Sequence, residues 1–405
     1  MRVVRVHKRP ARPLTLTLSL VLSVAATVFP AAAHAEGDSA VRLPVMHAQL
    51  DDGDRCTGRS PTVVASPTWE RQSLDLPRTW QFADGAGVAV AVVDTGVSVD
   101  VRSLSGRVAD LGAARSDCVG HGTFVAGIIA AAHEAGVGFQ GVAPSAHIIG
   151  VRGTDKRGAA TATTVAQGID AAVDAGADVI EVSLALGTSS KRLDDAIGHA
   201  AAKDVLIVAA AVPDASPSGS SRATSSPPPP RNYWPAAAPG VLSVVDTDVN
   251  GRRADNAWVP LTADLAAPGD GVVSNGPVGR GHYIGSGSSL AAAYVAGTAA
   301  LVRSAFPDLG AQDVARRLVS NAYPDSLPRL DPYAAVTSLS EGNQGSFVGG
   351  HSGPAVLMPQ AAYEAEVVSR ALTLAAVGAG LTIVVGWAAW VLPRGRSRRW
   401  RAAGK

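Results

Sequence analysis

The chain has 405 residues, of which 47% are hydrophobic and 17% are charged, and its formal net charge at neutral pH is +1. That length allows one large domain with appended segments, or two ordinary domains, and the apolar content is ample for a core. The small net charge provides no basic or acidic field, so nucleic acid is excluded as an expected partner.

The N-terminus has the pattern of a secretory signal peptide over residues 1–35. Basic residues precede an apolar stretch that runs from Leu14 to about Phe29. Ala33 and Ala35 then satisfy the small-residue rule for signal-peptide cleavage. An uncleaved membrane anchor is the alternative, which the short apolar run and the Ala-x-Ala site disfavour.

Residues 36–78 are expected to form an irregular N-terminal extension. They carry Cys56, and the only other cysteine of the chain is Cys118. An even pair in an exported chain usually forms a disulfide, and two free thiols are the alternative. The cysteines and histidines lack the spacing of a zinc site, so no cofactor and no metal is expected.

From about Val88 to Ala335, apolar runs of strand character alternate with alanine-rich segments of helical period. Strands are expected at 88–94, 146–152, 178–186, 205–212, 240–247 and 263–269, and helices at 123–132, 163–177, 192–203 and 290–306. Continuous apolar strands separated by helices are typical of a parallel sheet covered on both faces. The sequence therefore predicts an α/β domain of three layers, α/β/α, over residues 79–338, with its site beyond the carboxyl ends of the strands.

Three short stretches supply a carboxylate, an imidazole and a hydroxyl in chain order. Asp94 ends the first buried strand, His121 lies between two glycines before an apolar helix, and Ser289 begins another helix. A serine nucleophile needs an adjacent imidazole as base and a buried carboxylate to orient that imidazole. A helix N-terminus also directs backbone N–H groups toward an oxyanion, and Gly287 leaves room for a substrate carbonyl.

The C-terminal part has the composition of a membrane anchor. Residues 339–370 form a Gly/Ser-rich linker, and residues 371–392 are uncharged over the ~20 positions that a bilayer-spanning helix needs. Six basic residues within 393–405 give the positive cluster expected on the cytoplasmic side. We therefore expect a single-pass protein of the cell membrane, with its domain outside the cytoplasm and a cytoplasmic basic tail. A buried core helix is the alternative, which the basic tail disfavours.

The three stretches resemble the Asp, His and Ser signatures of the subtilases, the subtilisin-like serine proteases. The similarity covers most of residues 88–306, including "DVIEVSLAL", "YWPAAAPGVLSV" and "LAAPGDGVVS". It implies a serine endopeptidase with a protein or peptide substrate. In that role Ser289 attacks the peptide carbonyl, His121 transfers the proton and Asp94 orients the imidazole.

The same resemblance implies that Ser183 and Leu184 lie along an extended substrate in the cleft, although both residues also suit an ordinary core strand. A narrower resemblance is to the mycosins, the membrane-anchored subtilases of actinobacterial type VII secretion. It rests on the extension with "GDRCTGRSPTVV", on Cys118 just before the histidine, and on the C-terminal apolar segment. It implies that a Cys56–Cys118 bridge holds the extension near the cleft, and that the type VII secretion machinery is a partner.

The pattern departs from the family where the oxyanion is bound. Subtilases follow their alanine-rich strand with Gly-Asn, and the Asn amide donates a hydrogen bond to the oxyanion, whereas this chain has Val212 and Pro213 there. Proline has neither an N–H nor a side-chain amide. Loss of such a donor lowers kcat about 10²–10³-fold in subtilisin. Asn232, Ser218 or a water is expected to replace the missing amide.

Two functions therefore stay open. The first is a serine endopeptidase of low or narrowly triggered activity, which the intact triad favours. The second is a scaffold of subtilase fold that stabilises the secretion complex, which the missing Asn favours. Glu181, at a cleft position where mycosins tend to have Asn, is a further departure, and Asp117 is expected to be an ordinary loop carboxylate.

Overall fold

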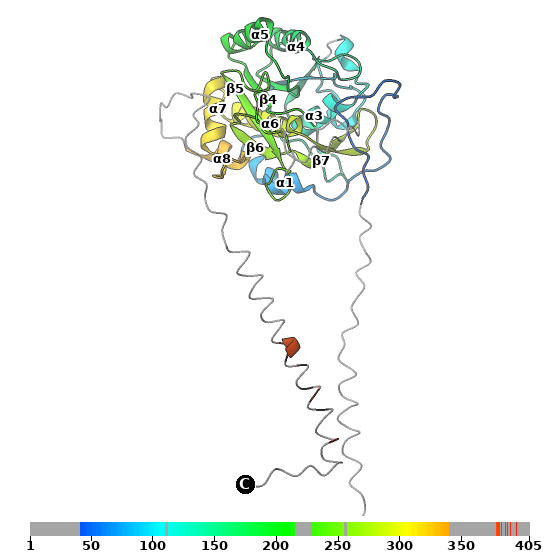
Figure 1. Ribbon diagram of the computed structural model, residues 1–405. Helices are drawn as coiled ribbons and strands as arrows, with labels where there is room; N and C mark the ends of the chain where they lie inside the picture. Colours follow the sequence, from blue (N-terminus) through cyan, green and yellow to red (C-terminus); the bar gives the residue numbers. More distant parts are fainter. Residues whose placement is uncertain are drawn as a thin grey trace, which may run out of the picture. The chain divides into compact units, whose positions relative to one another are not determined.

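A six-stranded parallel sheet forms the centre of the domain in this computed structural model (Figure 1). Its strands, in the spatial order β2-β1-β3-β4-β5-β6, are β1 (Ala89–Asp94), β2 (His147–Arg152), β3 (Val179–Val182), β4 (Leu206–Ala210), β5 (Val241–Thr247) and β6 (Leu265–Pro268). The chain passes from β1 to β2 on one side and then returns to β3 on the other side of β1. Such a reversal leaves a crevice at the carboxyl end of β1, where ligand sites of open α/β sheets form.

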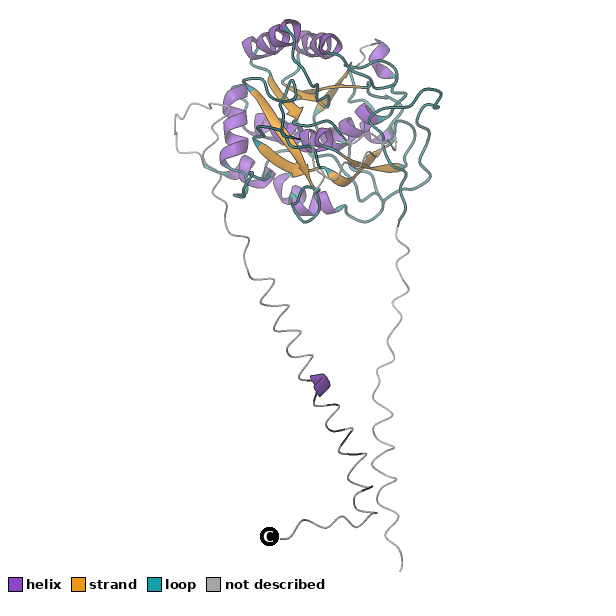
Figure 2. Ribbon diagram, viewed as in Figure 1, coloured by secondary structure: helices purple, strands orange, loops and turns teal. Residues whose placement is uncertain are grey.

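Helices cover both faces of the sheet, as Figure 2 shows. They are α3 (His121–Ala130), α4 (Ala162–Asp174), α5 (Lys191–Ala202), α6 (Ser288–Ala305) and α7 (Ala311–Ser320), and α8 (Pro332–Thr337) packs on α6 and α7. Val90 and Val92 of β1 join the core under α3 and α6, whereas Ala91 and Val93 join the core under α4 and α5. Successive strand residues face opposite sides of a sheet, so continuous apolar strands fill both cores. The prediction of a parallel sheet between two helical layers is confirmed.

The N-terminal extension packs along the body of the domain. It contains α1 (Trp69–Ser73) and α2 (Leu76–Thr79), so the expectation of an irregular segment is wrong for its last part. The extension also runs beside the antiparallel pair β7 (Asp270–Asn275) and β8 (His282–Ser286). There the Met46 amide donates to the Ile284 carbonyl at 2.8 Å, and the Ile284 amide donates to the Pro44 carbonyl at 3.0 Å. These contacts add the extension to the edge of the β7–β8 pair.

The predicted Cys56–Cys118 disulfide is present, and it joins residues 62 positions apart in the chain. Next to it, the Thr57 amide donates to the Cys118 carbonyl at 2.9 Å, and the Thr57 hydroxyl donates to the Val119 carbonyl at 2.5 Å. The extension is therefore fastened, covalently and by hydrogen bonds, to the loop that precedes α3.

The structure describes residues 41–109, 112–214, 229–254 and 257–339, with scattered positions between Gly378 and Arg394. The predicted signal peptide (1–35), nearly all of the linker (339–370) and most of the membrane helix (371–392) and basic tail (393–405) lie outside the described residues. The described positions from Gly378 to Arg394 are helical and belong to a second unit of the chain. No helix in the described part of the chain is both long and apolar enough to cross a membrane.

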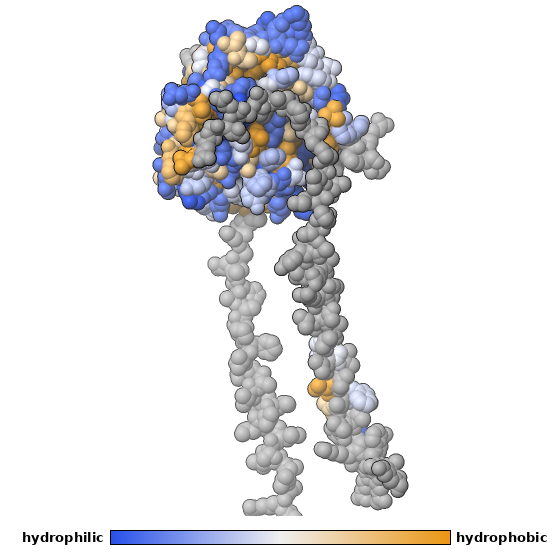
Figure 3. Space-filling view, turned by 90° about the vertical axis from the view of Figure 1, so that its left-hand side faces the viewer, coloured by the Kyte–Doolittle hydropathy of each residue, from blue (hydrophilic) through white to orange (hydrophobic). Residues whose placement is uncertain are grey.

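The face of the domain that carries α7 and α8 is a mixed surface. Hydrophilic residues cover much of it, and smaller hydrophobic patches lie between them (Figure 3). Singly exposed apolar side chains are normal on a protein surface. This face therefore gives no separate indication of a ligand.

Candidate active site

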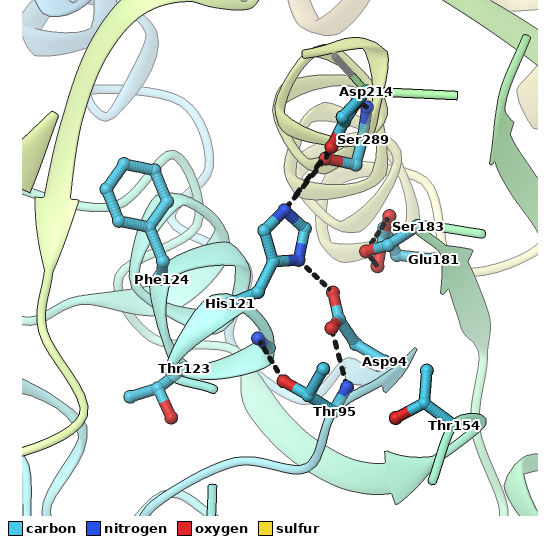
Figure 4. Close-up of polar contacts among 12 residues, drawn as sticks. Asp94, Thr95, His121, Thr123, Phe124, Thr154, Glu181, Ser183, Asp214 and Ser289 are labelled. Atoms are coloured by element: carbon cyan, nitrogen blue, oxygen red, sulfur yellow. Dashed lines mark hydrogen bonds and ion pairs between the residues drawn. The ribbon is translucent and has the colours of Figure 1, made fainter. Parts of the chain in front are cut away.

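The carboxyl end of β1 and the first turns of α3 and α6 meet at one point. Asp94 is the last residue of β1, His121 begins α3, and Ser289 lies in the first turn of α6. The His121 Nδ1 atom lies 2.7 Å from Asp94 Oδ2, and the His121 Nε2 atom lies 3.1 Å from Ser289 Oγ (Figure 4). All three side chains are buried. The structure thus brings together the three predicted residues at the distances that a nucleophile, its base and an orienting carboxylate need.

The buried pair of Asp94 and His121 favours its ionic form. Burial alone would raise the pKa of Asp94, but the charge of His121 and hydrogen bonds to the carboxylate hold that pKa below its usual range. One of those bonds comes from the Thr95 amide, which donates to Asp94 Oδ1 at 2.5 Å. Burial would lower the pKa of His121, but the charge of Asp94 and hydrogen bonds to Asp214 and Asp94 raise it well above its usual value. The imidazolium is therefore the favoured resting form of His121.

Asp117 anchors the turn that leads into α3. Its Oδ1 atom accepts hydrogen bonds from the Thr95 hydroxyl at 2.8 Å and the Gly120 amide at 2.7 Å. Its Oδ2 atom accepts hydrogen bonds from the Thr123 amide at 2.9 Å and the Thr123 hydroxyl at 2.7 Å. Burial raises the pKa of Asp117 in spite of these bonds. Asp117 lies in a loop, as expected, but its buried carboxylate has a structural role there. Its place just before a helix start, where free N–H groups need acceptors, was the signal available.

Two cavities lie on either side of His121. The first, of about 410 Å³, is lined by the predicted cleft residues Ser183 and Leu184, which follow β3 instead of extending it. The second, of about 370 Å³, lies toward β8. Ala48 of the extension lines both cavities together with His121. A larger cavity of about 540 Å³ contains none of the triad residues, so we place the site by its chemistry and not by cavity size.

Glu181 lies beneath the first cavity and is fully buried. The Ser183 hydroxyl lies 3.0 and 3.1 Å from its two carboxylate oxygens. Burial, with the negative charge of Asp94 added to it, raises the pKa of Glu181 well above its usual value. Burial of Glu181 under the cleft therefore favours its neutral form.

At the oxyanion position the structure places a residue that sequence reasoning missed. Pro213 lines the cleft cavity, as expected, and has no amide hydrogen to donate. The carboxylate of the next residue, Asp214, contacts Ser289, since its Oδ1 atom accepts the Ser289 amide N–H at 3.1 Å. Of the expected substitutes, Ser218 lies outside the described residues, and Asn232 lines neither of the two cavities. Nothing in the sequence marked Asp214, because Pro-Asp before a Ser-rich stretch is an ordinary turn pattern.

Gly287 makes room for the Asp214 carboxylate. A Cβ atom added at Gly287 would lie 2.1 Å from the Asp214 Cγ atom, which is far inside contact distance. We expected this glycine to give a substrate carbonyl access to the serine. In the structure, the same space holds the side chain of Asp214.

No metal site accompanies the triad in the residues that the structure describes, where no three His, Cys, Asp or Glu side chains are grouped to hold an ion. Both cysteines are used by the disulfide.

Residues 85–351 match the model of Peptidase_S8, the subtilase family. Thermitase of Thermoactinomyces vulgaris is 35% identical over 239 residues, which cover 58% of this chain and 81% of thermitase. Mycosin-3 of Mycobacterium tuberculosis is 34% identical over 310 residues, which cover 64% of this chain and 67% of mycosin-3. The solved structure of the MycP3 protease from the type VII (ESX-3) secretion system matches with a TM-score of 0.60 and 30% identity, over 73% of this chain and 94% of MycP3. A match of this extent shows that the chain belongs to the subtilase family and is a serine endopeptidase related to the mycosins.

Proposed function

We propose that this protein is a membrane-anchored, extracytoplasmic serine endopeptidase that works with a type VII secretion system, and that Asp94, His121 and Ser289 are its catalytic triad. The observation that carries this proposal is the hydrogen-bonded series from Asp94 through His121 to Ser289, at 2.7 and 3.1 Å. The relationship to mycosins, and to a MycP3 protease described as part of such a secretion system, supports the choice of partner.

The proposed reaction uses His121 in its neutral form. His121 Nε2 takes the Ser289 hydroxyl proton while Oγ attacks the peptide carbonyl, and the carbonyl electron pair moves onto its oxygen. The Ser289 amide at the start of α6 donates a hydrogen bond to that oxyanion. His121 then gives its proton to the leaving amine, and a water molecule releases the acyl group by the same steps in reverse. Asp94 holds the imidazole in the tautomer that this requires.

Residues 183–187 line the cleft cavity and are the proposed contact for an extended substrate. A bound peptide would lie along Ser183 and Leu184, where the chain has left the sheet after β3. Replacing Leu184 by Asp should raise KM for peptide hydrolysis more than it lowers kcat. An unchanged KM would contradict a contact with substrate at this position.

Labelling of Ser289 by a fluorophosphonate tests the proposed chemistry. The full-length protein, in detergent, is treated with the probe from mildly acidic to mildly alkaline pH, beside a Ser289→Ala variant. We expect an adduct on Ser289 that is absent from the variant, since only an activated serine reacts. The absence of any Ser289-dependent adduct at every pH would overturn the peptidase proposal.

A scaffold without required catalysis is the second candidate function. The carboxylate of Asp214 against the Ser289 amide favours it, because the oxyanion donor is already engaged. Secretion in a strain that carries Ser289→Ala separates the two functions. A scaffold predicts secretion intact with Ser289→Ala and lost on deletion of the gene, whereas a required protease predicts the same loss in both strains.

The proposed topology rests on the two terminal segments. A cleaved signal peptide would leave Ala35 as the last residue removed, and the anchor would place residues 393–405 in the cytoplasm. Protease added to intact spheroplasts should therefore digest the domain and spare a tag fused after Lys405. Digestion of the tag would contradict this orientation.

A further inference from the structure

The Asp214 carboxylate occupies the space beside Ser289 where an oxyanion would form. Its Oδ1 atom accepts the Ser289 amide N–H at 3.1 Å, and its Oδ2 atom accepts the Ser289 hydroxyl at 2.5 Å. The same Oδ2 atom lies 3.4 Å from His121 Nε2 (Figure 4). One side chain therefore contacts the nucleophile, the base and the backbone oxyanion donor.

This position is built into the site. The Asp214 side chain is only 8% exposed, and it lies over Gly287, where any Cβ atom would collide with it. Among the described residues, His121 is the only cationic partner within ion-pair distance of Asp214. Among these residues, Ser289, the residue that has to react, makes the other hydrogen bonds of the carboxylate.

The titratable groups that face Asp214 come from four elements. They are His121 from α3, Asp94 behind that imidazole at the end of β1, Glu181 from β3, and His47 from the extension, which lines a shared cavity. The negative charges of Asp94 and Asp214 lie at opposite nitrogens of His121. The raised pKa of Glu181 favours its neutral form, which adds no further charge.

An ionised Asp214 opposes the reaction in four ways. It takes the Ser289 amide that should bind the oxyanion, and it takes the Ser289 hydroxyl that His121 should deprotonate. It also keeps a proton on His121, because an imidazolium between two carboxylates is stabilised by both. A negative charge at this place would in addition repel the oxyanion itself.

We propose that Asp214 is a fourth catalytic residue, which closes the site as a carboxylate and, as a neutral acid, donates the second hydrogen bond to the oxyanion in place of the missing Asn amide. This inference rests on the proposed function. A neutral carboxylic acid is a competent oxyanion donor, and polar groups of this kind act strongly in a site that excludes water.

The active state differs from the resting state by the position of one proton. In the resting pair, the proton lies on His121 and Asp214 is ionised; in the active pair, it lies on Asp214 and His121 is a free base. The substrate carbonyl oxygen replaces Asp214 Oδ1 at the Ser289 amide. Oγ then bonds to the carbonyl carbon, the Ser289 proton passes to His121 Nε2, and the carbonyl electron pair moves to the oxygen. Asp214 O–H and the Ser289 amide N–H both donate to that oxygen.

The proposed mechanism therefore requires that His121 and Asp214 together hold one proton. At low pH both residues carry a proton and His121 is no longer a base. At high pH the pair loses its proton and Asp214 is a carboxylate in the oxyanion hole. Since the pKa of His121 lies well above its usual value, the alkaline limb should fall above the ordinary histidine range. The labelling rate of Ser289 is expected to have a bell-shaped dependence on pH.

The test compares Asp214→Asn with wild type and with Asp214→Ala, using the rate of fluorophosphonate labelling of Ser289 in the full-length protein at a series of pH values. Asn supplies a permanent amide donor and no charge. We expect its plateau rate to exceed that of wild type, because wild type must move a proton from His121 to Asp214 before Asp214 can donate, and to exceed that of Asp214→Ala by about 10²-fold, the usual worth of one oxyanion donor. Its alkaline limb should disappear, and its acidic limb should move to lower pH, because His121 has lost one carboxylate neighbour.

Asp214→Ala separates removal of the block from supply of the donor. It also frees Ser289 and His121, but it offers no hydrogen bond, so its rate should lie clearly below that of Asp214→Asn. Thermal unfolding of each variant checks that the fold is retained. Equal rates for the Asn and Ala variants would overturn the donor role, and equal rates for wild type and Asp214→Asn would overturn the whole inference while the peptidase proposal stands. No Ser289-dependent labelling in any variant would overturn both.

Discussion

The two nitrogens of His121 each face a carboxylate, and the two carboxylates act in opposite ways. Asp94 Oδ2 lies 2.7 Å from Nδ1, and Asp214 Oδ2 lies 3.4 Å from Nε2. Asp94 sits at the end of a buried strand, behind the imidazole, where its charge orients the base. Asp214 sits on the reacting side, where its charge competes with the substrate for Ser289. The same functional group thus assists or obstructs catalysis according to which nitrogen of the imidazole it lies beside.

Loss of Asp94 should be the most damaging change to this arrangement. We expect Asp94→Asn to lower the rate of Ser289 labelling about 10⁴-fold, because an amide keeps the shape but favours the wrong imidazole tautomer. The change is best measured in the Asp214→Asn background, where the starting rate is high. Asp214→Asn alone is the matched control, since it makes the same carboxylate-to-amide change on the other side of His121. A fall of less than tenfold would show that Asp94 does not orient the base.

The disulfide tests how firmly the loop before α3, which positions His121, is held. In the chain-entropy model, a bridge across 62 residues stabilises the fold by about 4 kcal/mol. The double variant Cys56→Ala, Cys118→Ala should lose about that free energy of unfolding, measured by urea denaturation. Reductant should destabilise wild type by a similar amount and leave the double variant unchanged. Equal stability of the oxidised and reduced wild type would contradict this role.

Asp117 is a second anchor of the loop before α3. Asp117→Ala removes the acceptor of four hydrogen bonds around the start of α3, and we expect a loss of about 3 kcal/mol in the free energy of unfolding. Labelling of Ser289 should also slow, since His121 is the first residue of that helix. Asp117→Asn keeps one acceptor oxygen and should lose less. If both variants unfold like wild type, the buried carboxylate is not what holds the turn.

The two carboxylates next to His121 also differ in whether the sequence could predict them. Asp94 and His121 lie where a buried strand ends and an apolar helix begins, and local patterns identify such positions. Asp214 contacts Ser289 across 75 positions of the chain. It lies in a turn-prone segment that shows neither helical nor strand periodicity. The expected substitutes were neutral donors, whereas the structure has an acid, because the sequence cannot show which side chain of a loop turns inward.

Short elements were missed for a similar reason. The helices α1 and α2 have five and four residues, too few for a helical period to appear, and they are stabilised by packing against the domain. The buried Glu70 of α1 illustrates this, since its Oε1 atom accepts the Val273 amide at 3.0 Å. In contrast, the two-sided core of the central sheet was predictable because each strand is apolar throughout.

Substitution of Glu181 gives the smallest expected effect and tests how much negative charge surrounds His121. Its folded pKa is raised, so between the ordinary value of 4.5 and that raised value the folded state keeps a proton that the unfolded chain has lost. Stability should therefore fall by about 1.4 kcal/mol per pH unit as pH rises through this window, from this group alone. Glu181→Gln should remove that slope, and Glu70→Gln, at a buried glutamate of the extension whose pKa is also raised, should remove a separate one.

The two variants should differ in their effect on the active site. Glu181 lies near both Asp94 and Asp214, whereas Glu70 accepts a hydrogen bond from Val273 of β7. Because a neutral Glu181 contributes no charge, Glu181→Gln should leave the alkaline limb of Ser289 labelling where wild type has it. A limb displaced to lower pH in Glu181→Gln, and not in Glu70→Gln, would mean that Glu181 is ionised and that three carboxylates stabilise the imidazolium. The carboxylates at the two nitrogens of His121 would then differ only in their distance from Ser289.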